Sequence, residues 1–325
     1  MKNVHLVIAD LFLPKDFGAS IGLHLPVLEK ILTRGKRRMH PAVSFEALLS
    51  GFFGVHGGLA PISAAFDGLE PGIWMRADPV HVRLQREQVV LLPNVDVSME
   101  ESAKLCMSLN AHFAGLGMEF FSPHANRWYL RLDALPDIAT VALSQAAGRN
   151  IHGNLPQGAD ERRWRQLFNE IQMLLHAHTV NEAREAQGEL AVNSLWLWGE
   201  GKDVQASSPY GHASSDEVLT DMLSSAAGIP FKPWQPVWHS EAGDEFLVFS
   251  GLRNSLQRGD LLAWRAALQD FESGNAKPLW QALRKGEIAR LNLDILGGDH
   301  LYRWSFERMD TLAFWRGSRR LDEVA

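Results

Sequence analysis

Residues 167–201 hold the side chains whose types and spacing point most directly to chemistry. A helical segment runs here into the apolar run Leu195–Trp198, which is followed by Gly199 and a second glycine two residues later. Open α/β sheets bind ligands outside the carboxyl ends of such strands, so we expect chemistry near Asn193 and Gly199. The run also has a purely structural interpretation, because its tryptophans and leucines alternate as in a strand buried on both faces, and the glycine permits a turn.

A resemblance to a known family bears on this choice. The matching residues are His178, Val180, Asn181, Arg184, Gly188, Asn193 and the run WLWGEG. In type and spacing they resemble the HPVN…R…G…AN…WLWGQG signature of the archaeal-type cofactor-independent phosphoglycerate mutases, a branch of the alkaline phosphatase superfamily. The resemblance implies that Asn181, Arg184 and Asn193 bind substrate. The chain as a whole also resembles bacterial regulatory proteins of the Rpf type that are described as phosphoglycerate mutase-like.

Asp10 and Ser44 are the candidate catalytic residues. Asp10 ends the apolar run Val4–Ala9, which predicts a buried strand with a carboxylate at its C-terminal tip. The resemblance places the superfamily's first metal-binding aspartate at this position. The segment SFEALLSGFFGV resembles the family's nucleophile segment, which implies that Ser44 attacks the phosphoryl group between two divalent ions. Ser44 is equally well suited to be the N-cap of a helix.

Arg76 and Arg127 are candidates for holding a phosphate or carboxylate group. The planar fork of a guanidinium matches an oxyanion. The segments WMRADP and HANRWYLRLD, which contain these arginines, resemble two arginine-bearing segments of the family. Each arginine also has the simpler interpretation of a structural ion pair.

The last third of the chain departs from the family's metal ligands. The segment LRNSLQRGD resembles the family's PDEAGHRGD, but Arg253 stands at the aspartate ligand and Gln257 at the histidine ligand. An arginine has no lone pair to donate and repels a cation, and an amide oxygen is a poorer transition-metal ligand than imidazole. Asp299 and His300 resemble the family's Asp-His pair, but no histidine follows His300. The resemblance therefore implies an incomplete two-metal site, formed by Asp10, Asp299 and His300.

Length and composition limit the class of protein. A chain of 325 residues suggests one large α/β domain that carries an inserted module. A net charge of -6 with mixed signs along the chain argues against a nucleic-acid partner. The single cysteine, Cys106, excludes an internal disulfide or a thiolate cluster. The first apolar run is too short for a signal peptide or a membrane span, which predicts a cytoplasmic protein without a membrane partner.

Alternating strand and helix patterns favour an α/β fold with a mostly parallel sheet covered on both faces. Strands are expected at Val4–Ala9, Val80–Leu92, Glu119–Leu132, Phe246–Phe249 and Arg290–Leu296. Helices are expected at Pro26–Gly35, Ser44–Gly51, Met99–Phe113, Asp160–Gln187, Asp216–Ala227, Asp260–Glu272 and Pro278–Lys285, and a loop at Lys202–Ser215. The resemblance implies an alkaline-phosphatase-like three-layer core, formed by residues 1–77 and 189–325, with an inserted α+β cap domain at residues 78–188.

These observations leave three hypotheses about function. The first is a degenerate relative that keeps an anion-binding cleft for a small phosphorylated or carboxylate metabolite, needs no cofactor, and acts in binding or regulation. The second is an active mutase that interconverts 2- and 3-phosphoglycerate through phosphorylated Ser44 and requires Mn, Mg or Zn. The third is an interaction module built on the aromatic residues Tyr302–Trp315, which would bury tryptophans in a homodimer or complex. The sequence leaves the oligomeric state open.

Overall fold

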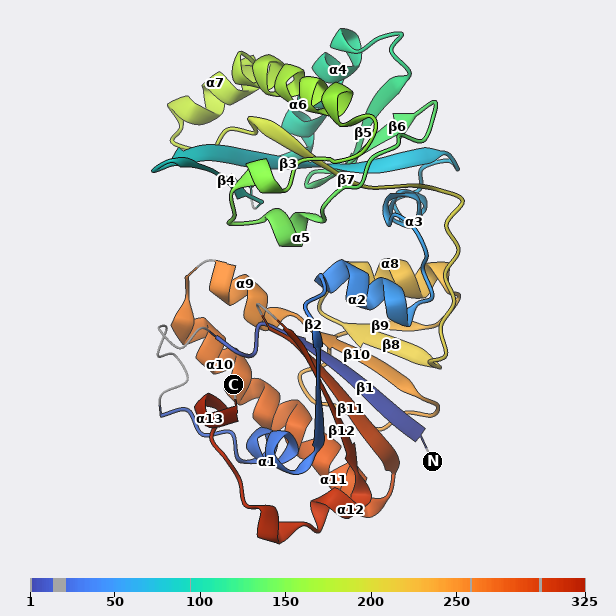
Figure 1. Cartoon of the computed structure of the whole chain (residues 1–325), viewed down its shortest axis with the longest axis vertical. Coiled ribbons are helices and arrows are strands. Elements are labelled where there is room, and N and C mark those ends of the chain that lie inside the picture. Colours follow the sequence, from blue (N-terminus) through green and yellow to red (C-terminus); the bar gives the residue numbers. More distant parts are fainter. Residues whose placement is uncertain (1, 14–21, 94, 258, 298–299, 325) are drawn as a thin grey trace. The chain divides into compact units, whose positions relative to one another are not determined.

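The computed structural model divides the chain into two compact units, which we describe separately. It describes residues 2–13, 22–93, 95–257, 259–297 and 300–324 (Figure 1). Unit 1 comprises Met1–Phe53 and Ser207–Ala325, and unit 2 comprises Gly54–Ala206. Within the described ranges, no helix is long and apolar enough to cross a membrane.

Unit 1 is built on a seven-stranded, largely parallel sheet. Its strands are β1 (Lys2–Ala9), β2 (Lys36–Pro41), β8 (His212–Ser215), β9 (Phe231–Pro233), β10 (Glu245–Phe249), β11 (Ile288–Leu296) and β12 (His300–Glu307). The order across the sheet is β2-β12-β11-β1-β10-β8-β9. Every pair from β11 to β9 is parallel, whereas β12 pairs antiparallel with both β11 and β2. The prediction of a mostly parallel sheet is confirmed, with β1 at its centre.

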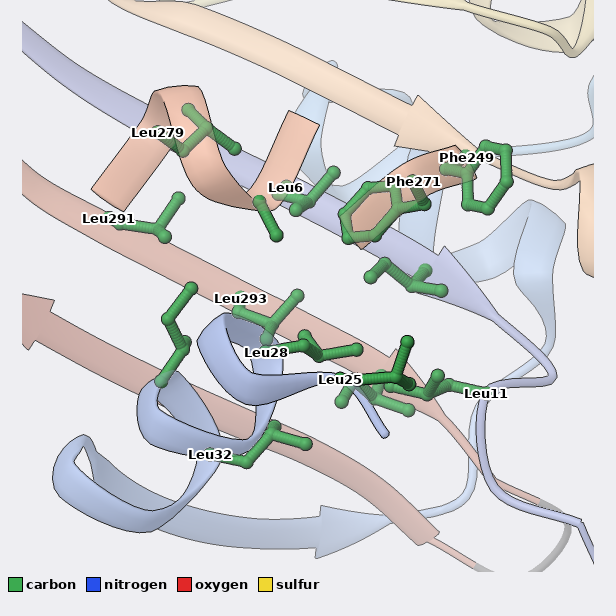
Figure 2. Close-up of a cluster of buried hydrophobic side chains, with 14 of the residues drawn as sticks. Leu6, Leu11, Leu25, Leu28, Leu32, Phe249, Phe271, Leu279, Leu291 and Leu293 are labelled. Carbon is green, nitrogen blue, oxygen red and sulfur yellow. The ribbon is translucent and has the colours of Figure 1, made fainter. Parts of the chain in front are cut away.

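Helices cover both faces of this sheet. They are α1 (Pro26–Arg34), α2 (Phe45–Phe52), α8 (Val218–Ala226), α9 (Gly251–Gln257), α10 (Leu261–Phe271), α11 (Lys277–Lys285), α12 (Arg308–Thr311) and α13 (Leu321–Val324), with a π-helical turn at Glu272–Ala276 and a 3-10 turn at Phe314–Arg316. Leucines of α1 and α11 pack against alternate residues of β1 and β11 to form the main core (Figure 2). The remote carboxylate of Glu272 accepts hydrogen bonds from the amides of Val27 and Leu28 at 2.7 and 3.0 Å, and so caps α1.

The opposite face of the sheet carries a buried polar network. Alternation along β1 turns His5 away from the main core and toward α2, where its ring lies 4.3 Å from that of Phe52. His5 Nε2 lies 3.3 Å from Asp294 Oδ2, and Arg303 donates two hydrogen bonds to the same carboxylate at 2.7 and 2.6 Å. Asp294 is fully buried. Its charge therefore depends on these two neighbours, which join β1, β11 and β12.

Unit 2 is an antiparallel sheet with helices on both faces. Its strands are β3 (Ile73–Gln85), β4 (Gln88–Leu92), β5 (Met118–His124), β6 (Arg127–Leu132) and β7 (Ser194–Lys202), and its helices are α3 (Ala60–Phe66), α4 (Met99–His112), α5 (Leu143–Ala146), α6 (Glu161–His176) and α7 (Thr179–Ala186), with a 3-10 turn at Ile151–Gly153. The long strand β3 pairs with β4, β6 and β7. Helices α4, α6 and α7 contribute to the core on one face, and α3 packs on a separate small cluster with Trp74 and Tyr129.

The run WLWGEG differs from its prediction. Strand β7 does not end at Gly199 but continues to Lys202, and it pairs antiparallel with β3 in unit 2. The rule for parallel strand ends therefore does not apply here. Gly199 adopts φ +70°, and a Cβ atom on Gly58 would lie 1.9 Å from the carbonyl oxygen of Glu200. The glycines serve this close backbone approach rather than a turn that binds a ligand.

Two further boundaries differ from expectation. The predicted loop Lys202–Ser215 ends in the short buried strand β8. The units separate after residues 53 and 206, whereas the cap was expected at residues 78–188. The reason is that α3 packs on β3, and β7 hydrogen-bonds along β3, so both belong to the antiparallel unit.

The Asp294 network generates a prediction about stability and pH. Burial alone would raise the pKa of the Asp294 carboxyl, but the hydrogen bonds from Arg303 and the proximity of His5 outweigh it and hold the pKa below its ordinary value. We expect Asp294→Asn to lower the free energy of unfolding by about 3 kcal/mol at pH 7, because it leaves Arg303 without its partner. Because the pKa of Asp294 is lowered in the folded state, its contribution to the free energy of unfolding is fully present above the unfolded-state pKa of about 4. This contribution is lost as the pH falls through the folded-state pKa.

The measurement is urea unfolding of both proteins at pH 7 and below pH 4, where the difference should shrink. Glu287→Gln serves as a control, because Glu287 forms an exposed ion pair with Lys285 at 3.8 Å. It should change stability by less than about 0.5 kcal/mol. An Asp294→Asn protein as stable as the wild type at pH 7 would contradict the account.

Candidate functional site

Asp10 lies where the sequence predicts, directly after the central strand β1 of unit 1. Its backbone adopts φ +59°, a left-handed conformation that is uncommon for a residue with a side chain. The indole Nε1 of Trp264, a fully buried residue of α10, donates a hydrogen bond to the Asp10 carbonyl oxygen at 3.1 Å. This bond fixes the loop, so the carboxylate is held at the C-terminal end of the strand.

The partner of this carboxylate is Arg253. Arg253 Nε donates to Asp10 Oδ2 at 2.9 Å, and the guanidinium carbon lies 4.5 Å from the centre of the Phe45 ring. The Arg253 side chain is 20% exposed. Its two Nη groups form no hydrogen bond to any residue that the structure describes. One edge of the guanidinium is therefore closed by Asp10, one face is covered by an aromatic ring, and the outer edge has no hydrogen-bond partner in the described part of the chain.

Ser44 immediately precedes the ring that supports Arg253. It is the N-cap of α2, and its Oγ accepts a hydrogen bond from the Ala47 amide at 3.0 Å. The helix-cap interpretation is thus confirmed. A serine nucleophile also needs a base or a metal to accept its proton. No side chain in the described ranges accepts a hydrogen bond from this hydroxyl, and the catalytic role of Ser44 stays a prediction.

Asp216 and Glu217 are two acidic residues that directly follow strand β8 of unit 1. Asp216 Oδ1 accepts a hydrogen bond from the Ser250 amide at 2.7 Å, which fixes the chain where α9 begins. Burial holds the pKa of the Glu217 carboxyl above its ordinary value; the negative charges of Asp216 and Glu46 act in the same direction, whereas Arg253 opposes them. The positive charge of Arg253 thus acts on Glu217 as well as on its hydrogen-bond partner Asp10.

The described residues around Asp10 do not by themselves form a two-metal centre. In the described part of the chain, no three His, Cys, Asp or Glu side chains are arranged to hold one ion. Asp299 and the side chain of Gln257 lie outside the described residues, so the predicted metal-binding role of Asp299 and the predicted loss of a ligand at Gln257 stay predictions. His300 is at the start of β12, with its ring 5.9 Å from that of Tyr302. The group that does reach Asp10 is a permanent cation, which occupies one carboxylate oxygen and repels a metal ion.

The predicted substrate-binding residues all belong to unit 2, where they form internal contacts. Arg76 pairs with Asp78 and donates to Ser63 Oγ at 3.0 Å. Arg127 donates two hydrogen bonds to Asp67 at 2.9 and 2.7 Å. Burial alone would raise the pKa of Asp67, but the bonds from Arg127 and Tyr129 outweigh it and lower the pKa. The structural ion pair, the simpler of the two interpretations, accounts for both arginines as placed here.

The two asparagines hold backbone segments of unit 2 together. The amide group of Asn181 donates to the carbonyl oxygens of Leu175 and Val192, and its Oδ1 accepts from the Val192 amide. Asn193 forms a similar pair of bonds with the backbone of Val82, at 2.8 and 2.9 Å. Asn181 is 1% exposed. Its hydrogen-bonding groups are used within the fold.

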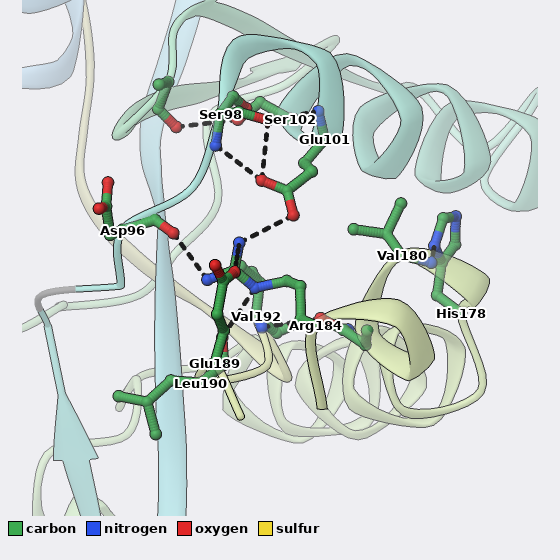
Figure 3. A network of polar contacts seen from close by, with 12 residues as sticks. Asp96, Ser98, Glu101, Ser102, His178, Val180, Arg184, Glu189, Leu190 and Val192 are labelled. Carbon is green, nitrogen blue, oxygen red and sulfur yellow. Dashed lines mark hydrogen bonds and ion pairs between the residues drawn. The ribbon is translucent and has the colours of Figure 1, made fainter. Parts of the chain in front are cut away.

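Arg184 is the centre of a buried network that links α7 to α4 (Figure 3). It donates to the Glu101 carboxylate at 2.8 Å and to the carbonyl oxygens of Asp96 and Leu190 at 2.6 and 2.8 Å. Glu189 lies 3.3 Å from the same guanidinium. Only 3% of the side chain is exposed. A guanidinium that can bind the oxygen atoms of a substrate can equally bind these fixed oxygen atoms of the protein. The sequence pattern alone therefore did not separate substrate binding from a structural role.

The Arg253–Asp10 ion pair does not follow from the sequence patterns. The sequence shows that Arg253 cannot bind a metal ion, but it identifies no partner for this side chain. The signal was present, since an arginine at a position facing the Asp10 strand end needs a carboxylate when it is mostly buried. Trp264 and Phe45, which support the pair, carried no sequence signal beyond being apolar.

Similarity to known proteins now adds to this geometry. No protein-family model matches the chain. The chain is 38% identical over 56 residues to a probable 2,3-bisphosphoglycerate-independent phosphoglycerate mutase of Geobacter sulfurreducens, covering 17% of this chain and 14% of that protein. It is 25% identical over 146 residues to 2,3-bisphosphoglycerate-independent phosphoglycerate mutase 2 of Methanothermobacter thermautotrophicus, covering 44% of this chain and 36% of that protein. A mutase of Methanosarcina mazei is 35% identical over 54 residues, which are 17% of this chain and 14% of that protein.

The chain is related to these mutases. The predicted resemblance to the cofactor-independent phosphoglycerate mutases is confirmed at this level. The matches span well under half of the length of these relatives, so their activity is not transferred with the relationship. These comparisons lend no support to the resemblance to Rpf-type regulatory proteins.

A solved structure of similar fold agrees with this architecture. The structure of PH0037 protein from Pyrococcus horikoshii covers 94% of this chain and 87% of that chain, with 15% identity and a TM-score of 0.50. A cofactor-independent phosphoglycerate mutase from Thermoplasma acidophilum covers 94% of this chain and 90% of that chain, with 16% identity and a TM-score of 0.46. The predicted α/β fold with a mostly parallel sheet is confirmed, and the structure adds a separate antiparallel sheet.

The Arg184 network generates a prediction that separates a structural role from substrate binding. We expect Arg184→Met to lower the free energy of unfolding by about 3 kcal/mol, because it leaves Glu101 and two backbone carbonyl groups without their donor. Arg184→Lys should recover little of this loss, because one ammonium group cannot reach all three oxygen atoms. The measurement is urea unfolding followed by tryptophan fluorescence.

Arg165→Met is the matched control on the neighbouring helix α6. Arg165 lies 3.7 Å from Glu161 and is 49% exposed, so its removal should cost less than about 0.5 kcal/mol. If Arg184→Met unfolded at the same urea concentration as the wild type but lost affinity for 3-phosphoglycerate, the substrate-binding role would replace the structural one.

Proposed function

We propose that this chain is a phosphoglycerate mutase-like protein of the alkaline phosphatase superfamily that binds a small phosphorylated or carboxylate metabolite without transferring its phosphoryl group. The binding residues would be Arg253, with its free outer edge, and the neighbouring Ser44, both in unit 1. The observation that carries the proposal is the ion pair between Arg253 and Asp10. A regulatory role in the cytoplasm is the use of such binding that we favour.

The chemistry of phosphoryl transfer supports this assignment. The transition state spreads negative charge over three oxygen atoms, and metal ions or several cationic groups must neutralise it. The Ser44 hydroxyl caps α2 and has no base among the described residues. A single guanidinium whose charge is already shared with Asp10 can hold an oxyanion, but it does not generate a nucleophile.

The competing function is an active mutase in which Ser44 is phosphorylated and a divalent Mn, Mg or Zn ion assists. The position of Ser44 at the start of α2, beside the ring that Arg253 covers, is the feature in its favour. Because Arg253 occupies Asp10, this function requires metal ligands that the described residues do not supply together.

Turnover and binding assays on the full chain test the proposal. We expect no interconversion of 2- and 3-phosphoglycerate and no phosphatase activity with added Mn²⁺, Mg²⁺ or Zn²⁺ beyond that of Ser44→Ala. We expect 3-phosphoglycerate to bind by isothermal titration calorimetry with an affinity in the micromolar to millimolar range, about −8 to −4 kcal/mol. Ser44→Ala should lower stability by about 1 kcal/mol because a helix cap is lost.

Ser98→Ala is the matched control, because Ser98 caps α4 in unit 2 by the same kind of bond. It should lose similar stability and leave ligand affinity unchanged. Metal-dependent turnover that disappears in Ser44→Ala, or a phosphoserine trapped at Ser44, would establish the mutase instead. A chain that shows neither turnover nor binding of 3-phosphoglycerate would refute the proposal.

A further inference from the structure

Resting on the proposed function, we infer that Arg253 is a resident cation that takes the place of a divalent ion at Asp10 and keeps such ions out of unit 1. The site around Asp10 would then be a closed cation site whose occupant is part of the chain. Its removal should raise the affinity of the Asp10 carboxylate for divalent ions.

The first support is that the pair is held more firmly than a surface ion pair. Most exposed ion pairs contribute little, because two mobile side chains must be ordered to form them. Here the Asp10 backbone is fixed through Trp264, and the guanidinium lies on the Phe45 ring. The surrounding fold therefore already restricts both side chains, so forming the ion pair costs less conformational entropy than it would on the surface.

The second support is the charge around Arg253. Arg253 contacts the Asp10 carboxylate directly, at 2.9 Å. A positive charge at this distance repels a second cation that approaches the same carboxylate. Carboxylate oxygens are the ligands that Mn²⁺ and Mg²⁺ prefer, so Asp10 should attract a metal ion more strongly once the arginine is gone.

The third support is the way the start of α9 is tied down. Asp216 accepts the Ser250 amide at 2.7 Å, one residue before α9 begins and three residues before Arg253. Ser250 is 2% exposed. The strand end at Asp10 and the helix that carries Arg253 are thus each anchored by a separate hydrogen bond. A divalent ion would have to displace the guanidinium from this arrangement before it could reach Asp10 Oδ2.

Direct measurement of Mn²⁺ binding to the full chain tests the inference. We expect wild-type protein to bind Mn²⁺ no more tightly than about 1 mM by calorimetry or electron paramagnetic resonance. Arg253→Met, which removes the charge but keeps an unbranched side chain, should bind Mn²⁺ at least about tenfold more tightly. Arg253→Asp, which adds a ligand, should bind it more tightly still. Adding Asp10→Asn to either variant should abolish the gain.

Arg290→Asp is the matched control for the change in net charge. Arg290 pairs with Glu307 at 2.7 Å in unit 1, with both side chains about half exposed. Arg290→Asp places two acidic groups side by side outside the Asp10 site, so it should not gain comparable Mn²⁺ affinity. Circular dichroism and a thermal transition for each variant establish that it is folded.

Two results would overturn the inference. One is tight Mn²⁺ binding by the wild-type protein that disappears in Asp10→Asn. The other is a folded Arg253→Met or Arg253→Asp protein with unchanged Mn²⁺ affinity. This test can fail independently of the proposed function. If 3-phosphoglycerate binds to the wild-type protein in EDTA but the Arg253 variants gain no Mn²⁺ affinity, only the inference that Arg253 acts as a resident cation is wrong. If the variants gain Mn²⁺ affinity but 3-phosphoglycerate does not bind the wild type, the proposed function fails instead.

Discussion

The ion pair between Arg253 and Asp10 is the interaction on which the candidate site of unit 1 depends. It brings a permanent positive charge to the C-terminal end of the central strand, where the sequence led us to expect a metal-binding carboxylate. The pair is possible because β1 ends in a left-handed residue and α9 begins directly beyond β10. Its position decides what the carboxylate can bind, since an oxygen that accepts from a guanidinium is not available to a metal ion.

Much of unit 1 could be predicted from local patterns. The β-branched run of β1, the proline that opens α1 and the serine that caps α2 each produced an element close to its expected bounds. The strands of unit 1 that escaped prediction were β2, β8, β9 and β12, and the reason is clearest for β2 and β8. β2 reads KRRMHP and is exposed along most of its length, so it shows no apolar alternation. β8 is only four residues long, and its small residues resemble a loop. Both are strands only because a neighbouring strand supplies their hydrogen bonds.

The candidate site residues were selected by the family resemblance rather than by local sequence patterns, and the resemblance did not reveal their partners. The resemblance selected Asn181, Arg184 and Asn193, and the structure shows that each one holds the backbone of unit 2 together. A sequence pattern can indicate that a polar residue has a specific role. It does not reveal the partner, because a buried polar side chain needs hydrogen bonds whether they come from a ligand or from a backbone carbonyl group. The partners of these residues come from segments distant in the chain, such as Asp96 for Arg184 and Val82 for Asn193, and no local pattern names them.

The distribution of matches and departures along the chain follows from this distinction. The strongest resemblance to the mutases lies in residues that stabilise unit 2, whereas Arg253, the departure whose side chain the structure describes, lies beside Asp10, where charge governs chemistry. The fold of a relative can therefore persist while the electrostatics of its site change, because packing and backbone bonds do not depend on the metal. Transfer of a phosphoryl group requires concentrated positive charge on both sides of the moving group. One delocalised guanidinium, already shared with a carboxylate, offers directional hydrogen bonds to an anion but far less charge than two divalent ions, and that difference is the physical basis of our proposal that the chain binds a metabolite without transferring its phosphoryl group.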